Sequence, residues 1–142
     1  RVVRLFGFEP KVAFVSHSTF GQPLTSRTKH IRKAVDILKD QKVDFEFDGD
    51  MQPDVALDTE YKELYPFSNI VGKANILIMP GQHSAAISYK MMKTLGDTKV
   101  IGPLLIGLGL PIEIAPLRSS TSELINLASV AASSADIIDY KK

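Results

Sequence analysis

The stretch KVAFVSHS, residues 11–18, decides the fold class of this 142-residue chain. It is a short apolar run of β-forming residues, and it ends in small polar residues. This pattern is typical of a buried parallel strand whose carboxyl end opens onto a loop. The loop follows as TFGQPLTS, residues 19–26. The stretch therefore predicts an α/β fold if helices and further strands alternate after it.

Helical and strand patterns do alternate along the rest of the chain. An amphipathic helix is predicted over 26–40, because apolar residues recur there at helical spacing, with Thr25 or Ser26 as cap. VDFEFDGD, residues 43–50, alternates apolar and acidic residues, which predicts a half-exposed strand near a sheet edge. The remaining expected elements are a short helix from Pro53, a buried strand at 74–80, a helix at 83–96 with Ala86, Ile87, Met91 and Leu95 inward, strands at 99–107 and 111–115, and a helix at 120–138.

This alternation predicts the fold class: a three-layer α/β/α domain with a mostly parallel sheet, whose ligands bind at the carboxyl ends of the strands. The length predicts a single domain over residues 1–142. The chain begins at Arg1 without a methionine and enters strand-like sequence almost at once. We therefore expect a portion of a longer protein.

The composition, 44% apolar and 23% charged, is that of an ordinary globular domain. The 17 basic and 16 acidic residues are scattered, which argues against nucleic acid as a partner. The absence of cysteine from the sequence excludes disulfides, thiolate metal sites and cysteine nucleophiles. Because the apolar runs are short and broken by glycine and proline, we expect no signal peptide, no membrane partner and a cytoplasmic location.

The stretch PLRSSTSELINL, residues 116–127, joins a Ser/Thr-rich turn to the last helix. Ser120 and Glu123 have the spacing of a capping box, whose side chains satisfy backbone donors at a helix start. The same helix start, with free amides and Arg118 and Ser119 beside it, would also attract a phosphate or carboxylate. Local sequence leaves both interpretations open.

Other candidate ligand contacts lie where predicted strands end or helices begin. His17 and His83 each have such a position, so either could face a ligand cleft. Ser16, Ser18 and Thr19 could donate hydrogen bonds to a phosphate, with an ordinary loop as the alternative. Lys90 is either a phosphate contact or a solvated charge.

Several familiar motifs are missing from the sequence. GPLLIGLG, residues 102–109, is neither a P-loop nor a dinucleotide fingerprint, and no Gly-x-Ser-x-Gly elbow supports a nucleophilic triad. Four aspartates miss the spacing of a calcium loop, so we predict a solvated turn and helix start there and no metal site. They are Asp48, Asp50, Asp54 and Asp58.

Six blocks in order identify a resemblance: KVAFVSHST, DGDMQPDVAL, VGKANILIMP, SAAISYKMMKTLG, IGPLLIGLGLPIEI and SELINLASVAA. Together they resemble the carboxyl-terminal part of phosphate acetyltransferases, whose fold is similar to that of isocitrate and isopropylmalate dehydrogenases. Free-standing members move an acetyl group between phosphate and coenzyme A. Bacterial NADP-dependent malic enzymes end in a similar domain, which looks like a regulatory module that binds acetyl-CoA.

The departures from the family pattern favour the malic-enzyme version. The transferases have Ser-Arg-Gly before the last helix and an Asp at its start, and the resemblance implies an arginine that holds phosphate and a carboxylate that deprotonates the thiol. Here Pro116 and Leu117 stand at the Ser and Arg, Arg118 comes one place late, and Glu123 aligns with the Asp. IEIAPL, residues 112–117, is closer to the malic-enzyme version, and the loop after residue 18 lacks the Gly/Ser-rich run of many transferases.

The resemblance thus implies an acetyl-CoA-sensing domain without transferase chemistry, in a homodimer or higher homo-oligomer with a malic enzyme catalytic domain in the same chain. Acetyl-CoA or CoA is the expected ligand, and NADP and Mg²⁺ or Mn²⁺ are expected only in the absent amino-terminal part. One alternative is an active phosphate acetyltransferase in which Arg118 and Glu123 are catalytic. Another is a scaffold that holds an oligomer together and binds no ligand.

Overall fold

The computed structural model describes residues 2–96 and 98–135. The chain divides into two compact units, Arg1–Tyr89 and Lys90–Lys142. The single domain predicted over residues 1–142 stays a prediction.

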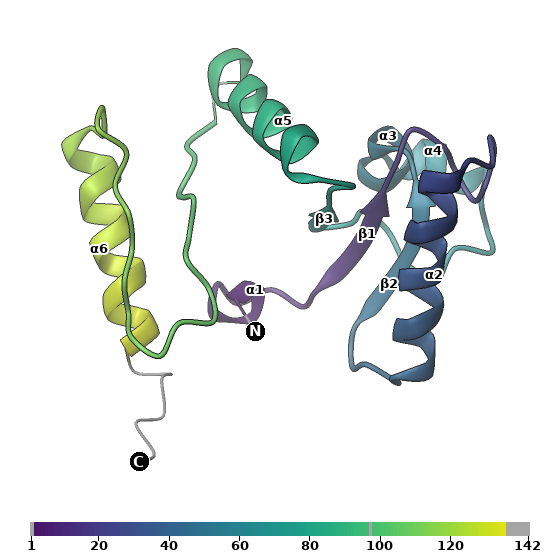
Figure 1. The fold of residues 1–142 in the computed structure, drawn as a ribbon, viewed down its shortest axis with the longest axis horizontal. Coiled ribbons are helices and arrows are strands. Elements are labelled where there is room, and N and C mark those ends of the chain that lie inside the picture. Colours follow the sequence, from purple (N-terminus) through teal and green to yellow (C-terminus); the bar gives the residue numbers. More distant parts are fainter. Residues whose placement is uncertain (1, 97, 136–142) are drawn as a thin grey trace. The chain divides into compact units, whose positions relative to one another are not determined.

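Three parallel strands form the sheet of the first unit (Figure 1). Their order is β2-β1-β3, with β1 at Lys11–Val15, β2 at Glu46–Met51 and β3 at Ile76–Ile78. Both pairings are parallel, and Val12 of β1 faces one residue of each neighbour. The predicted α/β class and mostly parallel sheet are confirmed, and the acidic strand β2 lies at an edge as expected.

The helices of the first unit begin where the sequence has caps. The helix α2, Ser26–Asp40, starts with a capping box between Thr25 and Thr28 and packs against β2. The helix α3, Pro53–Leu57, has its proline in the first turn, where a missing N–H removes no helical hydrogen bond. Two further short helices are α1, Val2–Leu5, and α4, Thr59–Glu63.

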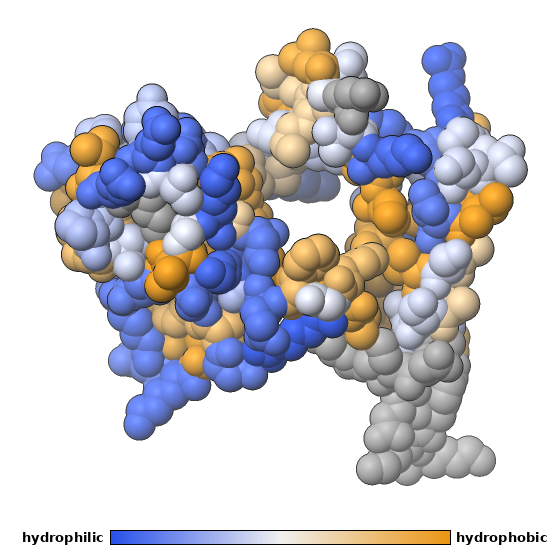
Figure 2. Space-filling view, turned by 180° about the vertical axis from the view of Figure 1, so that it is seen from behind, coloured by the Kyte–Doolittle hydropathy of each residue, from blue (hydrophilic) through white to orange (hydrophobic). Residues whose placement is uncertain are grey.

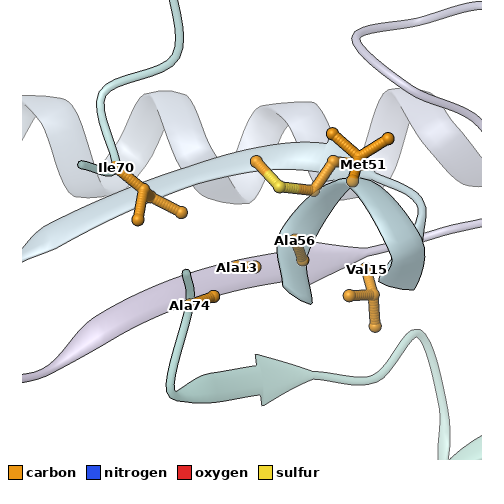
Figure 3. Packing of buried hydrophobic residues seen from close by; sticks show 7 residues of the cluster. Ala13, Val15, Met51, Ala56, Ile70 and Ala74 are labelled. Atoms are coloured by element: carbon orange, nitrogen blue, oxygen red, sulfur yellow. The ribbon is translucent and has the colours of Figure 1, made fainter. Parts of the chain in front are cut away.

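The core of the first unit lies between the sheet and α3 (Figure 3). Ala13 and Ala56 are fully buried, and their small side chains let strand and helix backbones approach closely. Met51 and Ile70 supply the volume around them, and full burial of each side chain stabilises the fold by about 1.5–3 kcal/mol. The complete cluster is Ala13, Val15, Met51, Val55, Ala56, Ile70 and Ala74.

The helix α5, Gln82–Leu95, confirms the helix predicted at 83–96, and the division between the units falls within it. The prediction of inward-pointing side chains on it is wrong, because α5 has no buried residue. Ala86, Ile87, Met91 and Leu95 are all exposed, Leu95 by 79%. Helical periodicity identified the apolar stripe without telling whether another element covers it.

The second unit has a long irregular segment before its last helix, α6, Thr121–Ala135. The strands predicted at 99–107 and 111–115 are wrong, since the described residues 98–120 contain no strand. A strand needs a neighbour for its backbone groups, and the Leu105 amide instead donates to the Glu113 carboxylate. The predicted helix at 120–138 is confirmed as far as Ala135, and its last three residues lie outside the described ones.

Apolar side chains of this part of the chain are largely exposed. Figure 2 shows them in orange on α5 and on the segment before α6. Leu127 is the one hydrophobic residue from position 90 to the end of the described range that is classed as buried. Across residues 2–96 and 98–135, no helix is long and apolar enough to cross a membrane.

Candidate ligand-binding site

Most of the predicted site residues fall in two places, the loop after β1 in the first unit and the start of α6 in the second, whereas His83 and Lys90 lie on α5. The loop runs from residue 16 to residue 22 at the carboxyl end of β1, beside the carboxyl end of β2. In open α/β sheets this end of the strands is where ligands bind.

The three hydroxyl residues of the loop are turned inward. Ser16, Ser18 and Thr19 are 8%, 0% and 6% exposed. The Ser18 hydroxyl donates its only hydrogen to the Asp50 carboxylate, and the Ser18 amide donates to Ser16 Oγ at 3.3 Å. Thr19 Oγ1 accepts a hydrogen bond from the Gln52 amide at 3.2 Å. These hydroxyls stabilise the loop, and their contact with a phosphate stays a prediction.

Backbone hydrogen bonds tie the same loop to the end of β2. The Ser16 amide donates to the Met51 carbonyl at 2.9 Å, and the Phe20 amide donates to the Asp50 carbonyl at 2.6 Å. Together with the hydrogen bond from the Ser18 hydroxyl to Asp50, these bonds connect Ser16, Ser18 and Phe20 to the end of β2. The loop is therefore fixed by the sheet.

The aspartates at the end of β2 correct one sequence prediction. A solvated turn was expected, but Asp48 and Asp50 are only 4% and 0% exposed. Asp48 accepts hydrogen bonds from the Gly49 and Asn69 amides at 2.9 and 2.7 Å, which compensates its burial. Asp50 Oδ1 has no partner among the described residues. The alternating pattern is recognisable in the sequence, but it does not tell that the acidic side chains face the protein interior here.

The remaining predicted contacts are exposed. His17 is exposed between buried neighbours, His83 is exposed in the first turn of α5, and Lys90 is exposed further along that helix. All three side chains are therefore open to solvent.

The start of α6 has the predicted capping box. The Ser120 amide donates to Glu123 Oε2 at 2.8 Å, and the Glu123 amide donates to Ser120 Oγ at 3.3 Å. Lys93 Nζ contacts the other carboxylate oxygen, Oε1, at 2.6 Å. The hydrogen bond from Lys93, followed by those from the Ser120 amide and hydroxyl, lowers the pKa of Glu123 from 4.5 to about 2.

A tight turn precedes this cap. The Pro116 carbonyl accepts hydrogen bonds from the amide and hydroxyl of Ser119, at 3.0 and 2.8 Å. Arg118 is exposed within the turn, and in the described part of the chain nothing pairs with its guanidinium. An unpaired cation beside helix amides that lack an intrahelical acceptor is an arrangement that favours an anion.

One hollow of about 420 Å³ lies elsewhere in the first unit, at the amino end of β2. None of the predicted site residues lines it. Its walls come from Leu38, Lys39, Lys42, Val43, Phe45, Glu46, Phe47 and Asn69. In residues 2–96 and 98–135, no group of three or more histidine, aspartate or glutamate side chains is placed to hold a metal ion.

Comparison with known families gives one match over most of the chain. The family model described as phosphate acetyl/butaryl transferase matches residues 1–132. Among solved structures, a phosphotransacetylase from Streptococcus pyogenes superposes with a TM-score of 0.87 at 32% identity, over 95% of this chain and 41% of that one. The EutD phosphotransacetylase from Staphylococcus aureus gives 0.84 at 29% identity, over 94% and 42%.

Similar sequences include malic enzymes and phosphate acetyltransferases. An NADP-dependent malic enzyme from Rhizobium meliloti is 47% identical over 131 residues, which are 92% of this chain and 17% of the relative. A phosphate acetyltransferase from Clostridium acetobutylicum is 34% identical over 128 residues, 89% of this chain and 38% of the relative. The chain thus spans less than a fifth of that malic enzyme and about two fifths of that transferase.

Proposed function

This chain belongs to the phosphate acetyl/butaryl transferase family, and we propose its function on that basis. It is a phosphotransacetylase-like domain, related to phosphate acetyltransferases and to the carboxyl-terminal regions of NADP-dependent malic enzymes. The proposed role is regulatory: the domain binds acetyl-CoA as an allosteric effector and carries out no acetyl transfer. The proposed parent protein is an NADP-dependent malic enzyme, in which malate is oxidatively decarboxylated to pyruvate and CO₂ by another part of the chain.

The main support for this proposal is that the Glu123 carboxylate is already hydrogen-bonded, to Lys93 and to the Ser120 amide. This residue aligns with the family carboxylate that deprotonates the thiol, but it serves as a helix cap and as the partner of Lys93. A general base is most effective when its pKa is near the working pH. An ordinary thiol has a pKa of about 8.5, whereas that of Glu123 is about 2. Both oxygens of Glu123 already accept hydrogen bonds, from Lys93 and Ser120, and its pKa is lower than that of an ordinary carboxylate, so it is a poorer base than an unengaged carboxylate would be.

The residues before the cap support the same conclusion. Leu117, at the position of the phosphate-holding arginine, is fully exposed and has no charge to offer a phosphate. Pro116 closes the turn through its carbonyl, in place of a serine that could donate a hydrogen bond. Binding can persist without these two groups, because Arg118 and the helix amides remain.

For the bound state, we place the phosphates of acetyl-CoA at Arg118, Ser119, Ser120 and the first amides of α6, with Glu123 as the cap of that helix. Ser16, Ser18 and Thr19 of the loop after β1 are proposed as further acetyl-CoA contacts, and so are the exposed His83 and Lys90. NADP and Mg²⁺ or Mn²⁺ belong, in this proposal, to the catalytic part of the longer chain.

Regulation requires two states that differ in their affinity for acetyl-CoA. We propose that the protein is a homodimer or a higher homo-oligomer and that the effector favours one arrangement of its subunits. The exposed Leu124 and Ile125 of α6 support an interface role for this helix, since both present apolar surface.

The test uses the full-length protein with acetyl-CoA and phosphate, and it measures acetyl phosphate and free thiol. We expect no turnover, binding of acetyl-CoA by calorimetry, and a change in the rate of malate oxidation when acetyl-CoA is added. Arg118→Ala should weaken binding roughly tenfold, as expected for a lost hydrogen bond to a charged group. Arg27→Ala, an exposed arginine of α2, is the matched control.

Two results would contradict the proposal. Transferase turnover that disappears in Glu123→Gln would establish an active phosphate acetyltransferase. If calorimetry detects no binding heat at millimolar acetyl-CoA, the protein has no effector site here, and the alternative of a scaffold that holds an oligomer together would be favoured.

A further inference from the structure

His17 differs from the two residues on either side of it in the chain. Val15, Ser16, Ser18 and Thr19 are all at most 8% exposed, whereas the His17 side chain is exposed. A single outward side chain in a buried run cannot be explained by a solvated loop, because its neighbours would then be exposed as well.

The backbone on both sides of His17 is held in place. Before it, the Ser16 amide donates to the Met51 carbonyl at 2.9 Å. After it, Ser18 is held through its hydroxyl by Asp50 and through its amide by Ser16 Oγ. The imidazole is thus presented from a preorganised backbone, so little backbone entropy would be lost when it contacts a ligand.

The surroundings of His17 favour an uncharged ligand group over a phosphate. The Ser18 hydroxyl hydrogen is already donated to Asp50, so it is not free for a phosphate oxygen. Two buried carboxylates, Asp48 and Asp50, end the neighbouring strand, and one oxygen of Asp50 has no partner among the described residues. The side-chain oxygens nearest the loop thus act as hydrogen-bond acceptors, so a phosphate, which also accepts hydrogen bonds, finds few donors among them.

We propose that His17 contacts the ligand and that its ring N–H donates a hydrogen bond to a carbonyl oxygen in the acyl-pantetheine arm of acetyl-CoA. This arm carries amide and thioester carbonyls and no charge, and it matches an imidazole better than the diphosphate does. The inference rests on the proposed function.

The test measures binding of three probes to the full-length protein by calorimetry: acetyl-CoA, S-acetylpantetheine and ADP. Loss of one neutral hydrogen bond lowers affinity about fivefold. We therefore expect His17→Ala to weaken acetyl-CoA and S-acetylpantetheine by about that factor and to leave ADP unchanged. His17→Asn keeps an N–H donor and should restore most of the affinity. His30→Ala, an exposed histidine of α2, should change nothing.

Thermal unfolding of each variant guards against a folding artefact, because an exposed side chain should leave the midpoint unchanged. Equal binding of acetyl-CoA by wild type and His17→Ala would overturn the inference, and so would a loss seen for ADP but not for S-acetylpantetheine. Failure of the wild-type protein to bind any probe is a different result, since it refutes the proposed function itself.

Discussion

The two units bury apolar residues to different extents, although both leave some of them exposed. The first buries Ala13, Met51 and Ile70 around its parallel sheet, whereas the second leaves Leu95, Ile106 and other large apolar side chains exposed. The apolar runs of the two units look alike in sequence. The comparison indicates that an apolar run becomes a strand or a core element only where another part of the protein pairs or packs with it.

The largest expected effect is in the core of the first unit. Met51→Ala should lower the free energy of unfolding by about 2–5 kcal/mol, because it removes a fully buried side chain and leaves a cavity. Chemical denaturation of the full-length protein measures the change. Met91→Ala on α5 is the matched control, because Met91 is 54% exposed and should cost much less. If both variants lowered the free energy of unfolding equally, Met91 would be as well packed as Met51, which would contradict the contrast between the two units.

The polar contact beneath the loop comes next in size. Ser18→Ala removes the hydroxyl that Asp50 accepts and leaves both oxygens of a buried carboxylate without a described partner. We expect a loss of about 1–3 kcal/mol in the free energy of unfolding. Ser122→Ala, an exposed serine of α6, is the control. A loss below 0.5 kcal/mol would mean that Asp50 finds another partner in solution.

The ion pair of the second unit predicts a dependence on pH. The pKa of Glu123 is about 2 in the folded state, below its ordinary value of 4.5, so folding favours the ionised form. Its contribution to stability is complete above about pH 4.5 and is lost as the pH falls to about 2. Glu123→Gln should therefore lower the thermal midpoint at pH 7, and the difference from wild type should vanish near pH 2. A difference that stays constant over this range would contradict the assignment.

The smallest expected effect is at Leu117. This side chain is fully exposed, so Leu117→Ser should change the free energy of unfolding by less than about 0.5 kcal/mol. Denaturation of the full-length protein measures it at two protein concentrations. A loss above 1 kcal/mol would show that another surface covers this residue in the assembled protein, and the contrast between the units would then hold only for the isolated chain.

Much of the first unit could be predicted from sequence because its signals are local. The strand in the stretch 11–18, the cap at Thr25 or Ser26 and the helix start at Pro53 each depend on a few adjacent residues. The structure has the strand at Lys11–Val15, the cap at Thr25 and the helix from Pro53. The strands predicted at 99–107 and 111–115 failed because pairing is not local. An isolated run carries no information about whether a partner strand lies beside it.

The candidate site shows the same division. The Ser120 and Glu123 cap was predictable, since both residues lie within one helical turn. The burial of Asp48 and Asp50 was not, because acidic residues in an alternating strand usually face water. Lys93, 30 residues from Glu123 in sequence, was also missed as its partner. Contacts between distant segments set the electrostatics here, and no local pattern encodes them.

The contact between Ser18 and Asp50 has an evolutionary consequence. The two residues are 32 positions apart in sequence, yet the Ser18 hydroxyl and one carboxylate oxygen of Asp50 pair with each other inside the protein. Replacing either one alone leaves a buried polar group without its partner, whereas replacing both with apolar residues of similar shape can be nearly neutral. Relatives that lack an acceptor at position 50 should therefore also lack a hydroxyl at position 18, and the two positions should vary together across the family.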